Sequence, residues 1–344
     1  HPLRKPAYDS SMRLLGGAFR IPRVLSRVFT SSEQRARALF PTFSDVQVRA
    51  FVSALGSNPS AELTRLEKEY RTLQKDLAAW IKDQPRSTLT LFDRQGGARK
   101  TFADAITQSW RRETQALKIV SGMPLNLPSL TADFPHVESL ELYNTPWTTG
   151  AENFIGRFKQ LKKLKIANAA MTELPKELTE MQNLAHLALQ GNRIRLTPAS
   201  VEQLGRLKKL EVLELAGNPL SLPPDFSDMP LLKTVNLSRT GLEQWPKGLR
   251  DQLNLEKVNL SYNALSTIPR EHLDPAPEHF ANVIRINHTI DLRNNAFVPQ
   301  TSLDLDNYWQ RVSQSHSGLM HLRDSNNFAF ETLDISDVQT VFPD

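Results

Sequence analysis

The stretch that decides the fold reads LAHLALQGN over 184–192, and it returns as LEVLELAGN over 210–218 and as LEKVNLSYN over 255–263. Each copy places apolar residues at its first, fourth and sixth positions and Asn at its ninth. Less complete copies begin at Val137, Leu161, Leu232 and, without its first position, around Ile290. Because the copies stay in register through the second half of the chain, they indicate one structural unit repeated about seven times.

The spacing of the copies identifies the type of repeat. The central apolar anchors are separated by 24, 23, 26, 22, 23 and 32 residues, and they are Leu140, Leu164, Leu187, Leu213, Val235, Val258 and Ile290. All but the last spacing fall in the range of about 20–29 residues that is typical of leucine-rich repeats. The sequence therefore predicts an α/β leucine-rich-repeat solenoid with short parallel strands on its concave face.

Each position of the repeat has a physical role. The alternating apolar pair lies on one face of a short strand, and the inward residues of successive turns stack into one core that no single repeat could bury alone. The Asn is expected to satisfy backbone groups of its own and neighbouring turns. Thr145, Ala169 and Thr240 replace that Asn, and we expect the ladder to be loosest at Ala169 because its side chain cannot hydrogen-bond.

Two longer spacings mark insertions. The 26-residue spacing predicts a short helix starting near Pro198, and the 32-residue spacing inserts the segment 272–287. Insertions of this kind map to loops on one face, where they serve either as binding features or as decoration, and the sequence does not choose between the two.

The region before the repeats predicts helices. We expect one over 44–55 that stops at Gly56, one capped by Ser60, and one that opens at Thr101, with a short strand over 88–92 between the last two. The second helix carries an apolar stripe at spacings of three and four, which predicts packing in a helical bundle, and its members are Leu63, Leu66, Tyr70, Leu73, Leu77 and Trp80.

The predicted organisation has three parts. Residues 1–130 form a helical region and cap whose first 30 residues are basic and flexible, 131–300 form the solenoid, and 301–344 form a C-terminal cap or linker. Because the chain starts at His1, we expect a processing boundary within a longer protein.

Charge and composition exclude several classes of protein. Of the 42 Lys and Arg, half lie in residues 1–130, where the balance is +10, against −5 in the remainder. The basic segment 10–30 is a candidate for docking on a membrane or on nucleic acid, the alternative being a solvated helix. No apolar run reaches the ~18–20 residues of a membrane span. With no cysteine, the chain has no disulfide, no cysteine-ligated metal and no thiol nucleophile.

Catalytic and metal-binding motifs are absent from the sequence. The eight histidines are scattered, no phosphate-binding or dinucleotide-binding glycine pattern occurs, and Asp304 and Asp306 lack a third ligand. Glycosylation-type triplets begin at Asn236 and Asn259, but they are products of the repeat. We therefore expect no enzymatic activity, no cofactor, no metal and no small-molecule substrate for this chain.

What remains is a surface. Strand residues between the inward anchors point to the concave face, and their mixed polar chemistry favours a protein partner over nucleic acid, which would require one sign of charge. The candidate binding residues are Tyr143, Lys163, Lys165, His186, Gln190, Glu214, Asn236, Lys257, Asn259, Asp291 and Arg293.

The segments that precede the repeats resemble a known family. They read LFPTFSD over 39–45, LTRLEKEYRTL over 63–73, FADAI over 102–106, WRRE over 110–113 and LNLP over 125–128. Together with the repeats, over roughly 30–300, the chain resembles the leucine-rich-repeat region of bacterial effector or toxin-like proteins of the novel E3 ubiquitin ligase family.

The resemblance implies that the repeats select a host substrate and restrain a ligase domain whose cysteine forms a ubiquitin thioester. It also implies a bacterial protein that is secreted or translocated into a host cell; without it, we expect a cytoplasmic protein. Since the chain has no cysteine, no catalytic residue of the family has a counterpart here. Two alternatives remain open: a self-contained interaction protein with no enzymatic parent, and membrane or nucleic-acid docking through the basic N-terminal segment.

Overall fold

The computed structural model describes residues 31–83, 97–122 and 124–315. The predicted strand over 88–92, the basic segment 10–30 and the chain after Ser315 lie outside the described residues. The described residues up to Leu117, with Pro128–His136, form one compact unit, and Lys118–Leu127 with the described residues from Val137 onward form a second. Each unit is described by itself.

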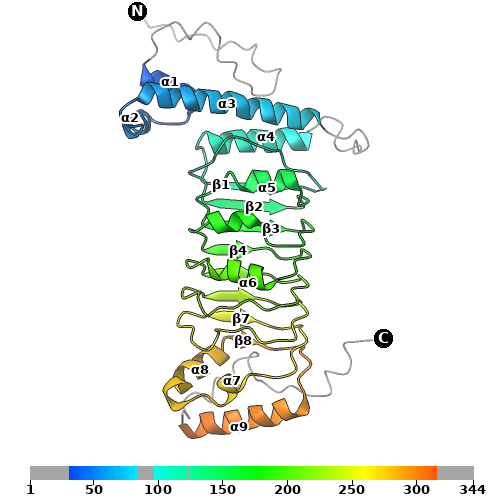
Figure 1. The fold of residues 1–344 in the computed structure, drawn as a ribbon. Coiled ribbons are helices and arrows are strands. Elements are labelled where there is room, and N and C mark those ends of the chain that lie inside the picture. The colour runs from blue at the N-terminus through cyan, green and yellow to red at the C-terminus, as the bar shows by residue number, and fades with distance from the viewer. Residues whose placement is uncertain (1–30, 84–96, 123, 316–344) are drawn as a thin grey trace, which may run out of the picture. The chain divides into compact units, whose positions relative to one another are not determined.

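The first unit is helical. Its helices are α1 (Ser32–Leu39), α2 (Asp45–Ala54), α3 (Pro59–Lys82) and α4 (Gly97–Trp110). Ser44 caps α2 by accepting from the Gln47 N–H, and Gly56 follows the helix with a φ of 81°, as the sequence predicts. In Figure 1, α1 and α2 lie beside the start of α3, and α4 runs along its later part.

Two predicted helix starts are wrong. Asn58, not Ser60, caps α3 by accepting from the Ala61 N–H, while the Ser60 hydroxyl accepts from Arg35. The Pro59 ring favours the first helical position, which moves the cap one residue upstream of it. The other wrong start is Thr101, which lies inside α4 and donates to the Gly97 carbonyl.

The predicted stripe on α3 is the core of this unit. All six of its residues are buried, and Tyr70 packs against Trp110 of α4 with ring centroids 5.2 Å apart. The Trp110 ring also stacks on Phe40, and its indole N–H donates to Glu69. This confirms packing in a bundle.

The second unit contains the repeats, and their strands form one parallel sheet in chain order (Figure 1). The strands are β1 (Ala116–Val120), β2 (Ser139–Tyr143), β3 (Lys163–Ala167), β4 (His186–Ala188), β5 (Val212–Glu214), β6 (Thr234–Asn236), β7 (Lys257–Asn259) and β8 (Ile290–Asp291). The sequence did not predict β1, although Leu117 and Ile119 alternate with exposed residues in it.

The strands pair in the register that the repeat predicts. Leu140 pairs with Leu164, Leu164 with Leu187, and the alignment continues to Val258 and Ile290. All seven anchors are fully buried. The predicted leucine-rich-repeat solenoid with its stacked core is confirmed.

Helical segments lie between some of the strands and after the last one. They are α5 (Thr149–Ile155), the 3₁₀ helix η4 (Lys176–Glu180), α6 (Pro198–Gly205), α7 (Arg270–Leu273), the 3₁₀ helix η5 (Pro277–His279), α8 (Phe280–Asn287) and α9 (Pro299–Ser315). The predicted helix at Pro198 is confirmed, with Thr197 as its cap. At the β8 end of the sheet, the array is closed by α7 and α8, which precede β8 in the chain, and by α9, which follows it (Figure 1). The insertion 272–287 buries Phe280 and Val283 there.

Buried Asn side chains join each turn of the solenoid to the next. The Asn263 amide donates to the Leu260 carbonyl of its own turn and to the Leu237 carbonyl of the preceding turn, at 3.0 and 2.8 Å. Its oxygen accepts from the Thr240 and Leu242 N–H groups. Equivalent donor pairs are made by Asn192, Asn218 and Asn295.

The three replacements of this Asn behave differently. Thr240 donates to the Leu237 carbonyl and so retains part of the pattern. The buried Thr145 hydroxyl has no hydrogen-bond partner among the described residues. At Ala169 only the backbone takes part, since its N–H donates to Asn192. The looseness expected at Ala169 stays a prediction.

We predict that Asn263→Ala lowers the free energy of unfolding by about 2–4 kcal/mol, because it strands several buried backbone groups that each cost ~1–3 kcal/mol when unpaired. Urea denaturation followed by circular dichroism measures the change. Asn183→Ala is the matched control, because Asn183 is a partly exposed Asn whose side chain bonds to the Gln160 side chain, and it should change stability by less than about 0.5 kcal/mol. Equal losses in both variants would contradict the role of the ladder.

A second prediction concerns the pH dependence of stability. His272 is fully buried beside Trp245 and shares a hydrogen bond with Asn287, and burial lowers the pKa of its imidazole below the ordinary 6.5. As the pH falls below 6.5, His272 becomes protonated in the unfolded chain but stays neutral in the folded chain. Stability is therefore lost between pH 6.5 and the lowered pKa of the folded state. The urea midpoint should therefore fall between pH 7.5 and 5, above the carboxylate range. His272→Gln should show a smaller fall; an identical fall would assign the effect elsewhere.

Candidate functional site

The open face of the sheet, opposite the buried anchors, carries the residues predicted to line the concave face. Because the strands are parallel and in register, these side chains form rows that cross the strands. The first row is Ser139, Lys163, His186, Val212, Thr234 and Lys257, and the second is Glu141, Lys165, Ala188, Glu214, Asn236, Asn259 and Asp291. Two residues further along each chain segment lie Tyr143, Ala167, Gln190, Ser238, Ser261 and Arg293.

All eleven predicted binding residues therefore lie on one face, and the structure brings them together in two groups. The first group, on β2–β5, is an ion-paired cluster. The second, on β6–β8, is an array of amides and hydroxyls. As binding residues, all eleven stay a prediction.

Glu141 is the centre of the ion-paired cluster. Its carboxylate lies 2.5 Å from the Lys163 ammonium and 3.9 Å from that of Lys118, and it accepts from the Tyr143 hydroxyl at 3.2 Å. The hydrogen bond from Lys163 outweighs partial burial and lowers the pKa of the Glu141 carboxyl. Glu141 is thus ionised at neutral pH, and the Tyr143 hydroxyl is held in place.

Lysines from the two strands that flank β2 lie near the Tyr143 ring. The Lys118 and Lys165 ammonium groups lie 5.4 and 5.2 Å from the ring centroid, within the range of a cation–π interaction. The interaction with Tyr143 raises the pKa of Lys165, and the carboxylates of Glu214 and Glu141 add to that rise. The sequence prediction missed Lys118; the alternation of β1 could have revealed it.

His186 and Glu214 form the other half of the cluster. The His186 Nε2 lies 3.4 Å from a Glu214 carboxylate oxygen, a long contact that is mainly electrostatic. Burial lowers the pKa of His186, the Glu214 carboxylate opposes that fall, and Lys163 reinforces it. His186 is therefore neutral at pH 7, and the cluster gains a positive charge when it is acidified.

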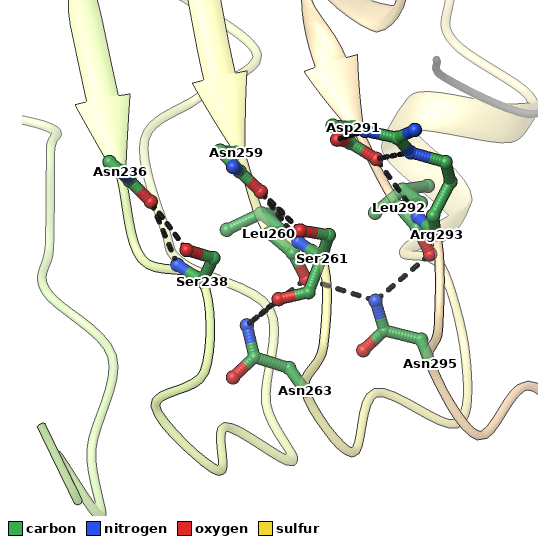
Figure 2. Close-up of polar contacts among 10 residues, drawn as sticks. All are labelled: Asn236, Ser238, Asn259, Leu260, Ser261, Asn263, Asp291, Leu292, Arg293 and Asn295. Carbon is green, nitrogen blue, oxygen red and sulfur yellow. Dashed lines mark hydrogen bonds and ion pairs between the residues drawn. The ribbon is translucent and has the colours of Figure 1, made fainter. Parts of the chain in front are cut away.

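In the second group, each side chain is fixed by the residue two positions later (Figure 2). The Asn236 oxygen accepts from the Ser238 N–H and hydroxyl at 3.1 and 2.8 Å, and the Asn259 oxygen accepts from the same groups of Ser261 at 2.9 and 2.6 Å. Asp291 takes the equivalent place on β8 and accepts from the Arg293 N–H and guanidinium. Asp291 holds the pKa of Arg293 above its ordinary value.

A column of left-handed backbone borders this face. Immediately before the position of the ladder Asn, each turn has a residue with φ between 55° and 70°, and these are Asn144, Asn168, Gly191, Gly217, Arg239, Tyr262 and Asn294. At Gly191 a Cβ would lie 2.6 Å from the Asn168 side-chain oxygen, so a larger residue there would displace the Asn168 side chain. For Arg and Tyr this conformation costs on the order of 1 kcal/mol or more.

Arg239 and Tyr262 occupy successive positions in this column and form an exposed pair. The Arg239 guanidinium lies 4.1 Å from the centroid of the Tyr262 ring, and the residue Tyr262 is 43% exposed. The left-handed backbone recurs before every ladder position, so it belongs to the repeat fold and does not by itself mark a functional residue. The sequence analysis did not single out either residue.

The described residues contain no cluster of three or more His, Asp or Glu that could hold a metal ion. Within the same ranges, no helix is long and apolar enough to cross a membrane.

Comparisons with known proteins agree with the repeat fold. The family model described as Leucine Rich Repeat matches residues 209–229. Over 155 residues, the chain is 30% identical to the transforming growth factor beta activator LRRC33 of Danio rerio, a match that covers 42% of this chain and 22% of that protein. The chain therefore spans well under half the length of this curated relative.

Solved structures with a related arrangement include two repeat proteins. Internalin C2 from Listeria monocytogenes is 15% identical, with a TM-score of 0.37, over 60% of this chain and 88% of that one. The plant peptide hormone receptor RGFR1 in complex with RGF2 is 18% identical, with a TM-score of 0.40, over 56% of this chain and 41% of that one. The family-model match, the strand register and the Asn ladder together show the leucine-rich-repeat fold.

We predict opposite shifts of the His186 pKa for two neighbouring substitutions. Glu214→Gln removes the carboxylate that favours the imidazolium and should lower the pKa further, whereas Lys163→Gln removes an opposing cation and should raise it. Nuclear magnetic resonance titration of the imidazole protons measures both. Lys159→Gln, an exposed lysine paired with Glu180, should leave the pKa unchanged. Shifts of the same sign in the first two variants would rule out the electrostatic explanation.

Proposed function

We propose that the open face of the repeat sheet binds a protein partner and that this chain acts by recognition and without catalysis. Stacked repeats offer extended surfaces of the kind that solenoid proteins use for binding. The observation that carries the proposal is the cluster around Tyr143, where an aromatic ring with two nearby lysines lies beside ionised Glu141.

The composition of the face favours a folded protein or a peptide over nucleic acid. Both signs of charge occur in the second row, where Lys165 lies between Glu141 and, beyond Ala188, Glu214. The carboxylates would repel the phosphates of a nucleic-acid backbone. Proteins bind such a backbone largely through Lys and Arg, which neutralise the phosphates and release their counterions. Tyr143 in the first group and Arg293 in the second are of residue types that are enriched among binding hot spots.

A narrower proposal follows from the family resemblance. We infer that the partner is a host protein and that the repeats select it as the substrate of a bacterial E3 ubiquitin ligase, whose catalytic cysteine would lie in another part of the protein. The lead-in segments over 39–45 and 110–113 support this proposal. The chain itself has no cysteine, so it departs from the family at the catalytic residue. The competing proposal is a self-contained interaction protein.

The gene sequence that follows the codon for Asp344 separates these two proposals. A cysteine-bearing domain there supports the ligase, and the full protein should then ubiquitinate the captured partner with added E1, E2, ubiquitin and ATP. If the gene encodes no such domain, the ligase proposal fails and the interaction protein remains.

We predict that the variants Tyr143→Ala and Lys165→Glu each weaken binding to the partner by about tenfold or more, because hot-spot truncations cost ~2 kcal/mol or more. Immobilised wild-type and variant proteins are compared for the proteins they capture from host-cell lysate, with quantitative mass spectrometry as the readout.

The matched control is Lys176→Glu, which makes the same charge change at an exposed lysine outside the open face. It should capture the same proteins as the wild type. If Tyr143→Ala and Lys165→Glu capture the same proteins as the wild type and in equal amounts, the open face is not the binding surface.

A further inference from the structure

The repeated Asn-Leu-Ser segments on β6 and β7 hold two side-chain amides in one orientation. In both, the amide oxygen accepts two hydrogen bonds from the Ser two residues later (Figure 2). Because the Ser backbone N–H can only donate, it must face the amide oxygen, and the donor ends of Asn236 and Asn259 therefore point away from the Ser.

Those donor ends have no hydrogen-bond partner among the described residues. Neither the Asn236 nor the Asn259 Nδ2 donates a hydrogen bond to any residue in the part of the chain that the structure describes. The two residues are direct neighbours in register, so their amide groups lie about one strand spacing apart, ~4.8 Å. Four N–H donors with fixed direction are thus presented side by side.

A lone cation lies next to them. Lys257 pairs in register with Thr234, one row from the two amides, and it is exposed. It forms no ion pair with a described residue. The adjacent carboxylate of Asp291 is 6% exposed and bound by Arg293. We call Asn236, Asn259 and Lys257 the amide–lysine patch: a set of donors with one unbalanced positive charge.

We propose that the amide–lysine patch binds one carboxylate of the protein partner. This inference rests on the proposed function and specifies a chemical group that the open face recognises. A carboxylate has two oxygens that accept from opposite sides, which suits two amides about one strand spacing apart. Its single charge matches Lys257, and charge-assisted hydrogen bonds are about twice as strong as neutral ones. The carboxylate is an Asp or Glu side chain or a chain terminus.

The adjacent strand shows why the amide matters. Asp291 occupies the same position with the same bonds to the residue two positions later, but its second oxygen is an acceptor that binds Arg293. An Asp in place of Asn236 or Asn259 would therefore keep the lock and replace a donor by a negative charge. The substitution changes recognition without removing the contacts that fix the turn.

The test uses short probes and the amide resonances of the intact chain. The tripeptides Ac-Ala-Glu-Ala-NH₂, Ac-Ala-Gln-Ala-NH₂ and Ac-Ala-Ala-Ala-OH, and inorganic phosphate, are titrated while the side-chain N–H signals of Asn236 and Asn259 are followed. The Glu peptide or the free-terminus peptide should shift both signals to saturation, and whichever binds more tightly identifies the source of the carboxylate. The Gln peptide should leave both signals unshifted.

Variants then assign the effect. Asn236→Asp and Asn259→Asp should each lower the affinity for the carboxylate peptide by about tenfold or more, since a hydrogen bond to a charged group is worth ~1.5–3 kcal/mol. Lys257→Gln should remove the salt dependence of binding. Asn183→Asp makes the same change at a partly exposed Asn that accepts from Lys209 and should have no effect on peptide binding. Urea midpoints confirm that each variant is folded.

Three outcomes would overturn the proposal: no shift with either carboxylate peptide, equal shifts with the Gln peptide, or tighter binding of phosphate. If one of them occurs while Tyr143→Ala still abolishes capture of the partner, only the carboxylate site is wrong and the open face remains the binding surface. If the peptides bind as expected while the Tyr143, Lys165 and patch variants all capture normally, the patch reads carboxylates but the proposed function is wrong.

Discussion

The need to satisfy buried backbone groups at every turn is the constraint on which the rest of this structure depends. A short strand of three residues, such as β5, cannot hold its own turn in place. Asn192, Asn218, Asn263 and Asn295 solve this problem by bonding the backbone of two successive turns. Each turn is therefore stable only beside its neighbour, which makes the array cooperative along its length.

The same constraint sets the chemistry of the open face. Because the ladder fixes where each strand ends, the residue before the ladder position has to adopt a left-handed backbone, and the residues on the strand are held in register. Lys165, Glu214, Asn236 and Asn259 thus come into one row although up to 94 residues separate them in the chain. The order of the row follows from the order of the repeats.

The helical unit shows where local sequence patterns fail. The stripe from Leu63 to Trp80 predicted its core correctly, because burial follows the helical period. The helix starts at Ser60 and Thr101 were wrong, since several residues there could serve as caps and local preference does not rank them. Pro59 and the contact of Ser60 with Arg35 decided one case. Arg35 is 25 residues away, beyond the reach of a local pattern.

The sequence by itself determined the repeat, its strand register, the buried anchors and the set of side chains on the open face, because each depends only on periodicity. Only the tertiary structure decided how those side chains pair. Glu141 is bound by Lys163 from the next turn, whereas Lys257 has no described partner and the Asn236 oxygen is locked by Ser238. Pairing depends on distances of 3–4 Å between different turns, which the repeat spacing alone does not set.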